Sequence, residues 1–106
     1  MLGDTVIMPC NATSSAGVIW TRNKTDGYFS IIYVNGSIVS HNGSLSLFSV
    51  VNTSAGAAYS LSIYNVQPDD SGFYDCYETD GRRIISYYLR VTYATEAGWL
   101  LFNCVN

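Results

Sequence analysis

The sequence predicts an all-β fold in which two sheets pack face to face as a sandwich. No segment sustains the spacing of apolar residues that is typical of an α-helix. Turn-forming residues instead recur every eight to twelve positions or so, which is the spacing of short strands in a sandwich. The chain has 106 residues, of which 48% are hydrophobic and 12% charged. This composition favours one packed domain and argues against disorder.

The first half of the chain contains five expected strands with alternating or short apolar runs. A polar loop at residues 11–16 separates the first two strands. Asn35-Gly36 follows the third strand and is the strongest short signal for a hairpin turn. The expected strands are Val6–Cys10, Val18–Arg22, Phe29–Val34, Ile38–Ser40 and Leu45–Val50.

The second half contains three more strands and a corner. Leu61 and Ile63 lie two positions apart and therefore face the same side of one strand. Residues 68–72, with the sequence Pro-Asp-Asp-Ser-Gly, break the alternation and predict a turn. The next strand covers residues 73–79, and the Asp-Gly pair at 80–81 predicts a two-residue turn before a last strand at 83–93.

One run of residues carries a family resemblance. The run Leu61-x-Ile63-x-x-Val66-x-x-x-Asp70-x-Gly72-x-Tyr74-x-Cys76, downstream of Cys10 and Trp20, resembles a variable-type domain of the immunoglobulin superfamily. A Tyr two residues before the second Cys is similar to the tyrosine corner of these sandwiches. The resemblance implies a V-type Greek-key domain over residues 1–93, with residues 94–106 as a C-terminal extension of uncertain role.

The resemblance also implies a disulfide between Cys10 and Cys76, with Trp20 as the tryptophan that packs on it. Variable domains often pair the corner Asp with an Arg. No Lys or Arg occurs between residues 34 and 81, so we expect Asp70 to lack that partner. A joining-segment motif before the end of the last strand is also missing, which favours an adhesion, co-receptor or innate-type receptor over a rearranged antigen receptor.

The residues after the last expected strand are strongly apolar. Residues 99–102, with the sequence Trp-Leu-Leu-Phe, should pack along a sheet edge or against a second copy of the chain. The third cysteine, Cys104, then has three interpretations: a bond to another chain, a free thiol, or the truncated end of a longer protein.

Five Asn-x-Ser/Thr sequons predict N-linked glycans and an extracellular location, on a cell surface or secreted. The alternative is that Asn and Ser are simply common in turns. No stretch reaches the roughly 20 apolar residues of a membrane span, so we expect any membrane anchor to lie outside these residues. The acceptor residues are Asn11, Asn23, Asn35, Asn42 and Asn52.

Strand alternation also predicts a binding surface. If Trp20 and Cys76 face the core, their neighbours in sequence face away from it. A large apolar patch on a sheet face marks an interaction site, although a slip of one residue would place the same side chains in the core. A glycan on Asn23 would crowd this face. The predicted patch consists of Ile19, Ile31, Tyr33, Tyr77, Ile84 and Tyr88.

The sequence favours binding over catalysis. The net charge of −3 argues against nucleic acid or an anionic membrane as a partner. No metal-ligand spacing occurs, so we expect no metal, cofactor or small-molecule substrate. His41 is expected to be a loop residue, the Asp69–Asp70 pair to diverge at its corner, and Cys104 to lack a His–Asp pair. We therefore expect a recognition module of a cell-surface receptor that binds a protein partner; the alternative is a module that pairs with itself as a homodimer.

Overall fold

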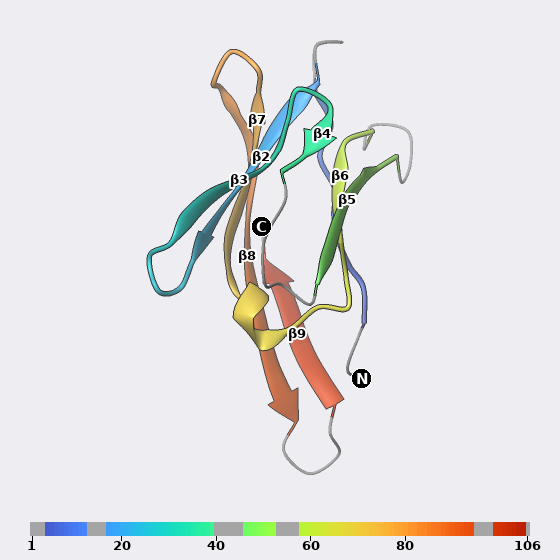
Figure 1. Ribbon diagram of the computed structural model, residues 1–106, viewed down its shortest axis with the longest axis vertical. Helices are drawn as coiled ribbons and strands as arrows, with labels where there is room; N and C mark the ends of the chain where they lie inside the picture. The colour runs from blue at the N-terminus through green and yellow to red at the C-terminus, as the bar shows by residue number, and fades with distance from the viewer. Residues whose placement is uncertain (1–3, 13–16, 40–45, 53–57, 95–98, 106) are drawn as a thin grey trace.

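The computed structural model describes residues 4–12, 17–39, 46–52, 58–94 and 99–105, with the backbone alone described from residue 93 onward. Two antiparallel sheets pack against each other (Figure 1). The smaller sheet has the order β1 (Val6–Met8), β6 (Ser60–Tyr64), β5 (Leu47–Val51). The larger sheet has the order β4 (Ser37–Ile38), β3 (Phe29–Val34), β2 (Val18–Lys24), β7 (Gly72–Glu78), β8 (Arg83–Ala94), β9 (Trp99–Val105). The predicted all-β sandwich is confirmed.

The core lies between the sheets and follows the alternation of the strands. Val6 and Met8 of β1 are buried while Ile7 between them is exposed, and β7 shows the same alternation around Tyr74 and Cys76. Each large side chain that is fully buried in this way contributes roughly 1.5–3 kcal/mol to folding. The buried hydrophobic residues are Val6, Met8, Cys10, Val18, Trp20, Ile32, Leu61, Ile63, Val66, Tyr74, Cys76, Tyr87, Leu89 and Val91.

The predicted disulfide is confirmed. Cys10, just after β1, is bonded to Cys76 of β7, with 6.6 Å between the two Cα atoms. The bond therefore joins the smaller sheet to the larger one through the centre of the core. Trp20 lies directly opposite Cys76 in the pairing of β2 with β7 and is fully buried. This is the position that the resemblance implied for the core tryptophan.

Two aromatic side chains add hydrogen bonds between the sheets. Trp20 donates its indole N–H to the carbonyl oxygen of Tyr59, at 2.8 Å. Tyr87 stacks on Trp20 with 6.3 Å between ring centroids and donates its hydroxyl to the carbonyl oxygen of Pro9, at 2.6 Å. Both rings lie in the core, but their polar atoms reach backbone acceptors, so neither polar group is buried without a partner.

The corner before β7 is organised by Asp70 and Tyr74. A single 3-10 turn, η1 (Pro68–Asp70), occupies the predicted turn. The fully buried Tyr74 donates its hydroxyl to the carbonyl oxygen of Asp70, which confirms the tyrosine corner. The Asp70 carboxylate accepts hydrogen bonds from the hydroxyl of Ser46 at 2.8 Å and from the backbone N–H of Gln67 at 2.7 Å.

The expectation that Asp70 lacks a basic partner is wrong. Arg22 of β2 approaches the Asp70 carboxylate with 3.4 Å between Nη1 and Oδ1, and both side chains are almost fully buried. Arg22 shares the inward alternation of Trp20, and its guanidinium lies 5.3 Å from the centre of the Phe48 ring. Arg22 precedes residues 34–81 in the sequence, and the pairing of β2 with β7 brings it to the corner.

Glycine and asparagine carry backbone conformations that other residues resist. Asn35 and Gly36 have φ angles of 54° and 77°, which confirms the hairpin turn between β3 and β4. The second predicted turn has three residues, 79–81, rather than two, because the N–H of Glu78 donates to the carbonyl oxygen of Arg82. Gly72 has a φ of 152°, and a Cβ there would lie 2.5 Å from the carbonyl oxygen of Asn23.

The C-terminal residues form an edge strand. β9 pairs antiparallel with β8, from Ala94 opposite Trp99 to Tyr88 opposite Val105. Of the two expected arrangements for this segment, the structure has the one in which it lies along a sheet edge. The two strands run past the corner turn η1 and form the lower end of the molecule in Figure 1. Cys104 lies in β9, opposite Leu89.

The Arg22–Asp70 ion pair predicts a large difference between two substitutions in β2. Arg22→Leu leaves a buried carboxylate without its cation and should lower the free energy of unfolding by about 3 kcal/mol or more. The control is Lys24→Leu, since Lys24 pairs at 2.9 Å with Asp69, whose side chain is 84% exposed. That loss should stay below about 1 kcal/mol. Urea denaturation of both variants measures the difference, and equal losses would contradict the account of the corner.

Tyr74→Phe keeps the buried ring but removes its hydrogen bond, so it should cost about 1 kcal/mol. Burial raises the pKa of Tyr74, although the nearby charge of Arg22 opposes this. Because the pKa of Tyr74 is raised in the folded state, the stability that its protonated hydroxyl contributes is fully present below about pH 10, the ordinary pKa of tyrosine. This stability is lost as the pH rises further. Unfolding free energies measured between pH 8 and roughly pH 11 should therefore decline more steeply in the wild type than in Tyr74→Phe.

Candidate functional site

The outer face of the larger sheet is the side that points away from the smaller sheet. Strand register arranges its central residues in rows that run across the strands. We call the first one the aromatic row: Phe29 of β3, Phe73 of β7 and Tyr88 of β8, with Asn23 of β2 between the two phenylalanines. Directly opposite residues in antiparallel strands have Cβ atoms about 5 Å apart, so these side chains are neighbours.

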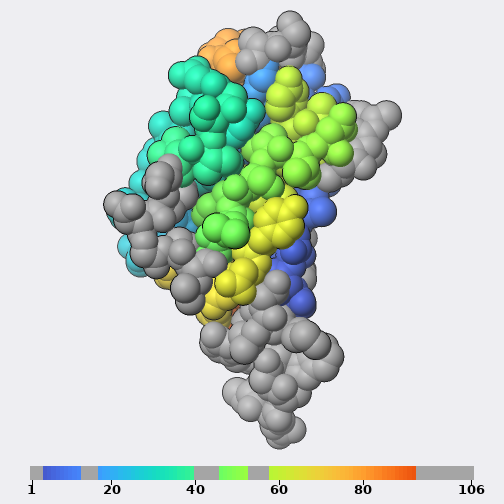
Figure 2. Space-filling view, turned by 45° about the vertical axis from the view of Figure 1, so that its right-hand side comes forward, coloured from blue at the N-terminus to red at the C-terminus, as the bar shows by residue number. Residues whose placement is uncertain are grey.

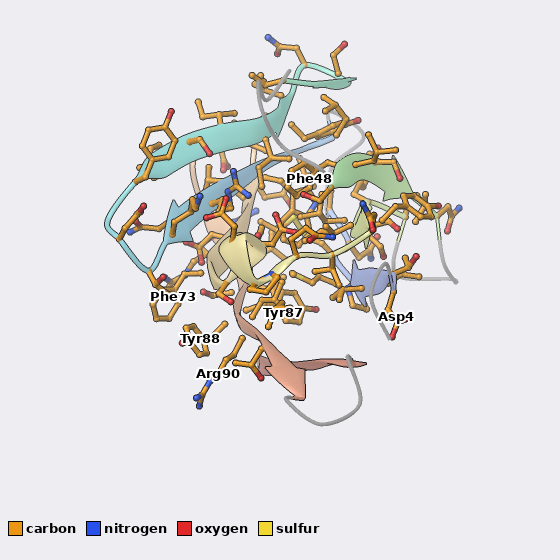
Figure 3. The ribbon with its side chains drawn as sticks, turned by 60° about the horizontal axis from the view of Figure 1, so that its bottom comes forward. Asp4, Phe48, Phe73, Tyr87, Tyr88 and Arg90 are labelled. Atoms are coloured by element: carbon orange, nitrogen blue, oxygen red, sulfur yellow. A yellow bond between two sulfur atoms is a disulfide. The ribbon has the colours of Figure 1, made fainter. Side chains whose placement is uncertain are left out.

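The aromatic row is well exposed. Phe29 is 59% and Phe73 is 50% accessible to solvent. The rings of Phe73 and Tyr88 contact each other with 4.9 Å between their centroids. Figure 3 shows Phe73, Tyr88 and Arg90 following one another along the outside of the sheet, whereas Tyr87 lies toward the core. Tyr87 and Tyr88, which are adjacent in β8, therefore lie on opposite faces of the sheet.

The second row, two residues further along each strand, is more polar. It runs from Ile31 of β3 through Thr21 and Asp75 to Ser86 of β8. Ser86 donates its hydroxyl to the Asp75 carboxylate, and Thr21 is buried within the row. Ile31 is 42% exposed and is the apolar residue of this row. The row separates the aromatic row from the residues at the other end of the face.

The third row is irregular because β2 and β8 each meet a neighbour across a bulge. Ile19 pairs with Tyr77, and both are half-buried. A register shift then places Arg83 of β8 opposite Tyr77. Ile84, beside Arg83, packs in part against the core, and so does Tyr33 of β3. These two residues are therefore partly core residues, as one of the two interpretations of the sequence allowed.

The structure thus brings together most of the predicted patch but extends it. Ile31, Tyr77 and Tyr88 are exposed or half-buried on β3, β7 and β8, and β2 lies between β3 and β7. Phe29 and Phe73, which are more exposed than any of these, were absent from the predicted patch. The signal was available in the sequence, since each lies two positions before a residue that alternation had already placed outside.

The outer face of the smaller sheet offers a comparison. Figure 2 shows β5 and β6 side by side on that surface, with β1 next to them. Leu47 and Tyr64 are paired and exposed there, Leu47 to 67%. The next row contains Ile7 with Ser62 and Ser49, which are small and polar. The exposed apolar residues of this face are Ile7, Leu47 and Tyr64.

The remaining predicted residues separate into exposed, buried and undescribed ones. Asn11, Asn23, Asn35 and Asn52 are exposed, while Asn42 and His41 lie outside the described residues, as does the side chain of Cys104. The corner carboxylates diverge as expected, one into the core network and the other to Lys24 at the surface. Within the described residues there is no group of His, Cys, Asp and Glu that could hold a metal ion, and no helix long and apolar enough to cross a membrane.

Comparison with known proteins agrees with this geometry. The family model of the immunoglobulin V-set domain matches residues 1–93. No curated protein and no solved structure matches the chain. V-set domains are typically binding modules without enzymatic activity, commonly for protein partners, and those with an intrachain disulfide are typically extracellular. Because the match covers most of the chain and the structure has the expected sandwich, the protein belongs to the immunoglobulin V-set family.

Proposed function

We propose that this chain is the recognition domain of a cell-surface immunoglobulin-type receptor or adhesion protein, and that it binds a protein partner through the outer face of the larger sheet. One observation carries the proposal. Phe29 and Ile31 of β3 and Phe73 of β7 are exposed apolar side chains on a face where solvated sheets normally carry polar residues. Several exposed apolar side chains on one face mark a site of interaction.

The arrangement suits a protein partner better than a small molecule. The face is built from paired strands, and small-molecule sites are usually concave pockets. A typical protein interface buries roughly 800 Å² on each partner, and a few central apolar side chains supply most of its binding energy. Ile31 of β3 and Tyr77 of β7 are candidates for this role. Arg83 and Arg90 are exposed on β8, where charges at a rim would steer the approach of an acidic partner.

An extracellular location is part of the proposal. The disulfide in the core requires an oxidising compartment to form and persist. Four of the five sequon asparagines are exposed among the described residues, so they are accessible to glycosylation. The same apolar face could also pair with a second copy across a two-fold axis, which is the alternative function and an outcome of the test below.

The test compares one acidic substitution on each sheet. Ile31→Asp replaces an exposed apolar side chain of the proposed face by a charge and should weaken partner binding at least about tenfold. Leu47→Asp is the control, because Leu47 is the more exposed residue and lies on the smaller sheet. The measurement is the titration of tetramers of the glycosylated domain on a panel of cell lines. Sedimentation of the untagged domain tests self-association in parallel.

The outcomes separate the two functions. Staining of cells by the tetramers, lost in Ile31→Asp and kept in Leu47→Asp, supports the receptor when the untagged domain sediments as a monomer. A dimer that dissociates in Ile31→Asp supports the homodimer instead. Equal effects of the two substitutions would exclude the larger sheet as the binding face.

A further inference from the structure

We propose that Asn23 carries an N-linked glycan whose first sugars lie on the aromatic row. The protein partner then binds the part of the outer face of the larger sheet that the glycan leaves uncovered. The proposal deepens the proposed function, since it assigns different occupants to the two ends of one face. It does not depend on the identity of the partner.

The acceptor is well placed for the modification. Asn23 is the second-last residue of β2, is exposed, and belongs to the sequon Asn23-Lys24-Thr25. The loop to β3 begins at Thr25, which is also exposed. A hydrogen bond of 2.8 Å from the N–H of Lys24 to the carbonyl oxygen of Tyr28 closes this loop. The sequon therefore spans the end of β2 and the start of the hairpin loop.

The aromatic neighbours of Asn23 offer a surface on which sugar rings can pack. Asn23 pairs with Phe29 on one side and with Phe73 on the other, and Phe73 contacts Tyr88. A glycan linked to Asn23 therefore starts between two aromatic rings that are at least half exposed. N-acetylglucosamine presents C–H groups on the faces of its ring, and these pack on aromatic rings as apolar surface does. The sugar would bury part of both phenylalanines.

The position of Asn23 also argues against a protein partner over this row. An unmodified Asn in the middle of an apolar contact would have its amide removed from water, which is costly unless the partner supplies hydrogen bonds. A glycosylated Asn keeps its distal sugars in water and covers the apolar rings with its first ones. The row with Ile31 and the pair of Ile19 and Tyr77 contain no sequon, so they stay free for the partner.

A second sequon provides a matched control. Asn35 is exposed in the turn between β3 and β4, with a φ of 54°, and is not a register partner of any strand residue among the described pairs. A glycan there projects beyond the strands and has no aromatic row beside it. Thr25→Ala and Ser37→Ala remove the sequons of Asn23 and Asn35 without changing either asparagine. The two substitutions therefore remove one glycan each.

The experiment measures occupancy and thermal stability in the isolated domain. Secreted protein from mammalian cells is mapped by mass spectrometry, and Tm is measured for wild type, Thr25→Ala and Ser37→Ala. We expect glycan on Asn23, a Tm lower by about 3 °C or more in Thr25→Ala, and little change in Ser37→Ala. In a Phe73→Ser background, Thr25→Ala should lower Tm by clearly less than it does in the wild type, because only one of the two phenylalanine rings beside Asn23 remains. The same variants from bacteria, which carry no glycan, report any effect of the substitutions alone.

A second readout does not depend on stability. Ring currents of Phe29 and Phe73 should shift the proton resonances of the first N-acetylglucosamine on Asn23, and Phe73→Ser should reduce that shift. An unmodified Asn23, or a loss of Tm in Thr25→Ala that is the same with and without Phe73, would overturn the proposal. Because none of these measurements involves a partner, their failure is distinct from a failure of the Ile31→Asp test.

Discussion

The disulfide between the two sheets is the constraint on which the rest of this domain depends. It closes a loop of 66 positions, and a cross-link of that length contributes about 4 kcal/mol to a domain of this size. One half-cystine follows β1 and the other lies in β7, so the bond fixes the separation of the sheets at their centre. Trp20 and Tyr87 lie in the core with it and donate hydrogen bonds to the carbonyl oxygens of Tyr59, just before β6, and Pro9, just after β1. The residues that stabilise the fold therefore lie on the inner faces of the two sheets.

A second point of attachment lies at the corner before β7. The carboxylate of Asp70 connects β2, the residue before β5 and the backbone before η1, while Tyr74 holds the corner from within. Sheets that are fixed at two points form a rigid platform, and a rigid surface loses little conformational entropy when it binds. The outer face of the larger sheet is free to carry exposed phenylalanines and isoleucines because the core does not need them. The inner faces stabilise the fold, and the outer face of the larger sheet carries exposed apolar residues. This difference between the faces is the physical basis of the proposed recognition function.

The sequence predicted most of the fold because alternation and turn chemistry are local signals. The strand at 29–34, the Asn35-Gly36 turn and the tyrosine corner agree with the structure. The Arg22–Asp70 pair was missed because ion pairs depend on which segments meet in space. The site was predicted less completely, because bulges in the pairing of β2 with β3 and of β7 with β8 interrupt alternation where Tyr33 and Ile84 lie. Where the strands are regular, as at Phe73, alternation alone is sufficient to place a side chain on the outer face.

A new glycan on each outer face tests most directly which of them binds the partner. Tyr77→Asn creates an acceptor before Glu78 and Thr79 on the larger sheet, and Leu47→Asn creates one before Phe48 and Ser49 on the smaller sheet. Each is a single substitution that adds the same bulky group, at half-buried Tyr77 and at exposed Leu47. With occupancy verified by mass spectrometry, binding of the tetramerised domain to cells should be abolished by Tyr77→Asn and preserved by Leu47→Asn. Binding that survives the first glycan and is lost with the second would contradict the account.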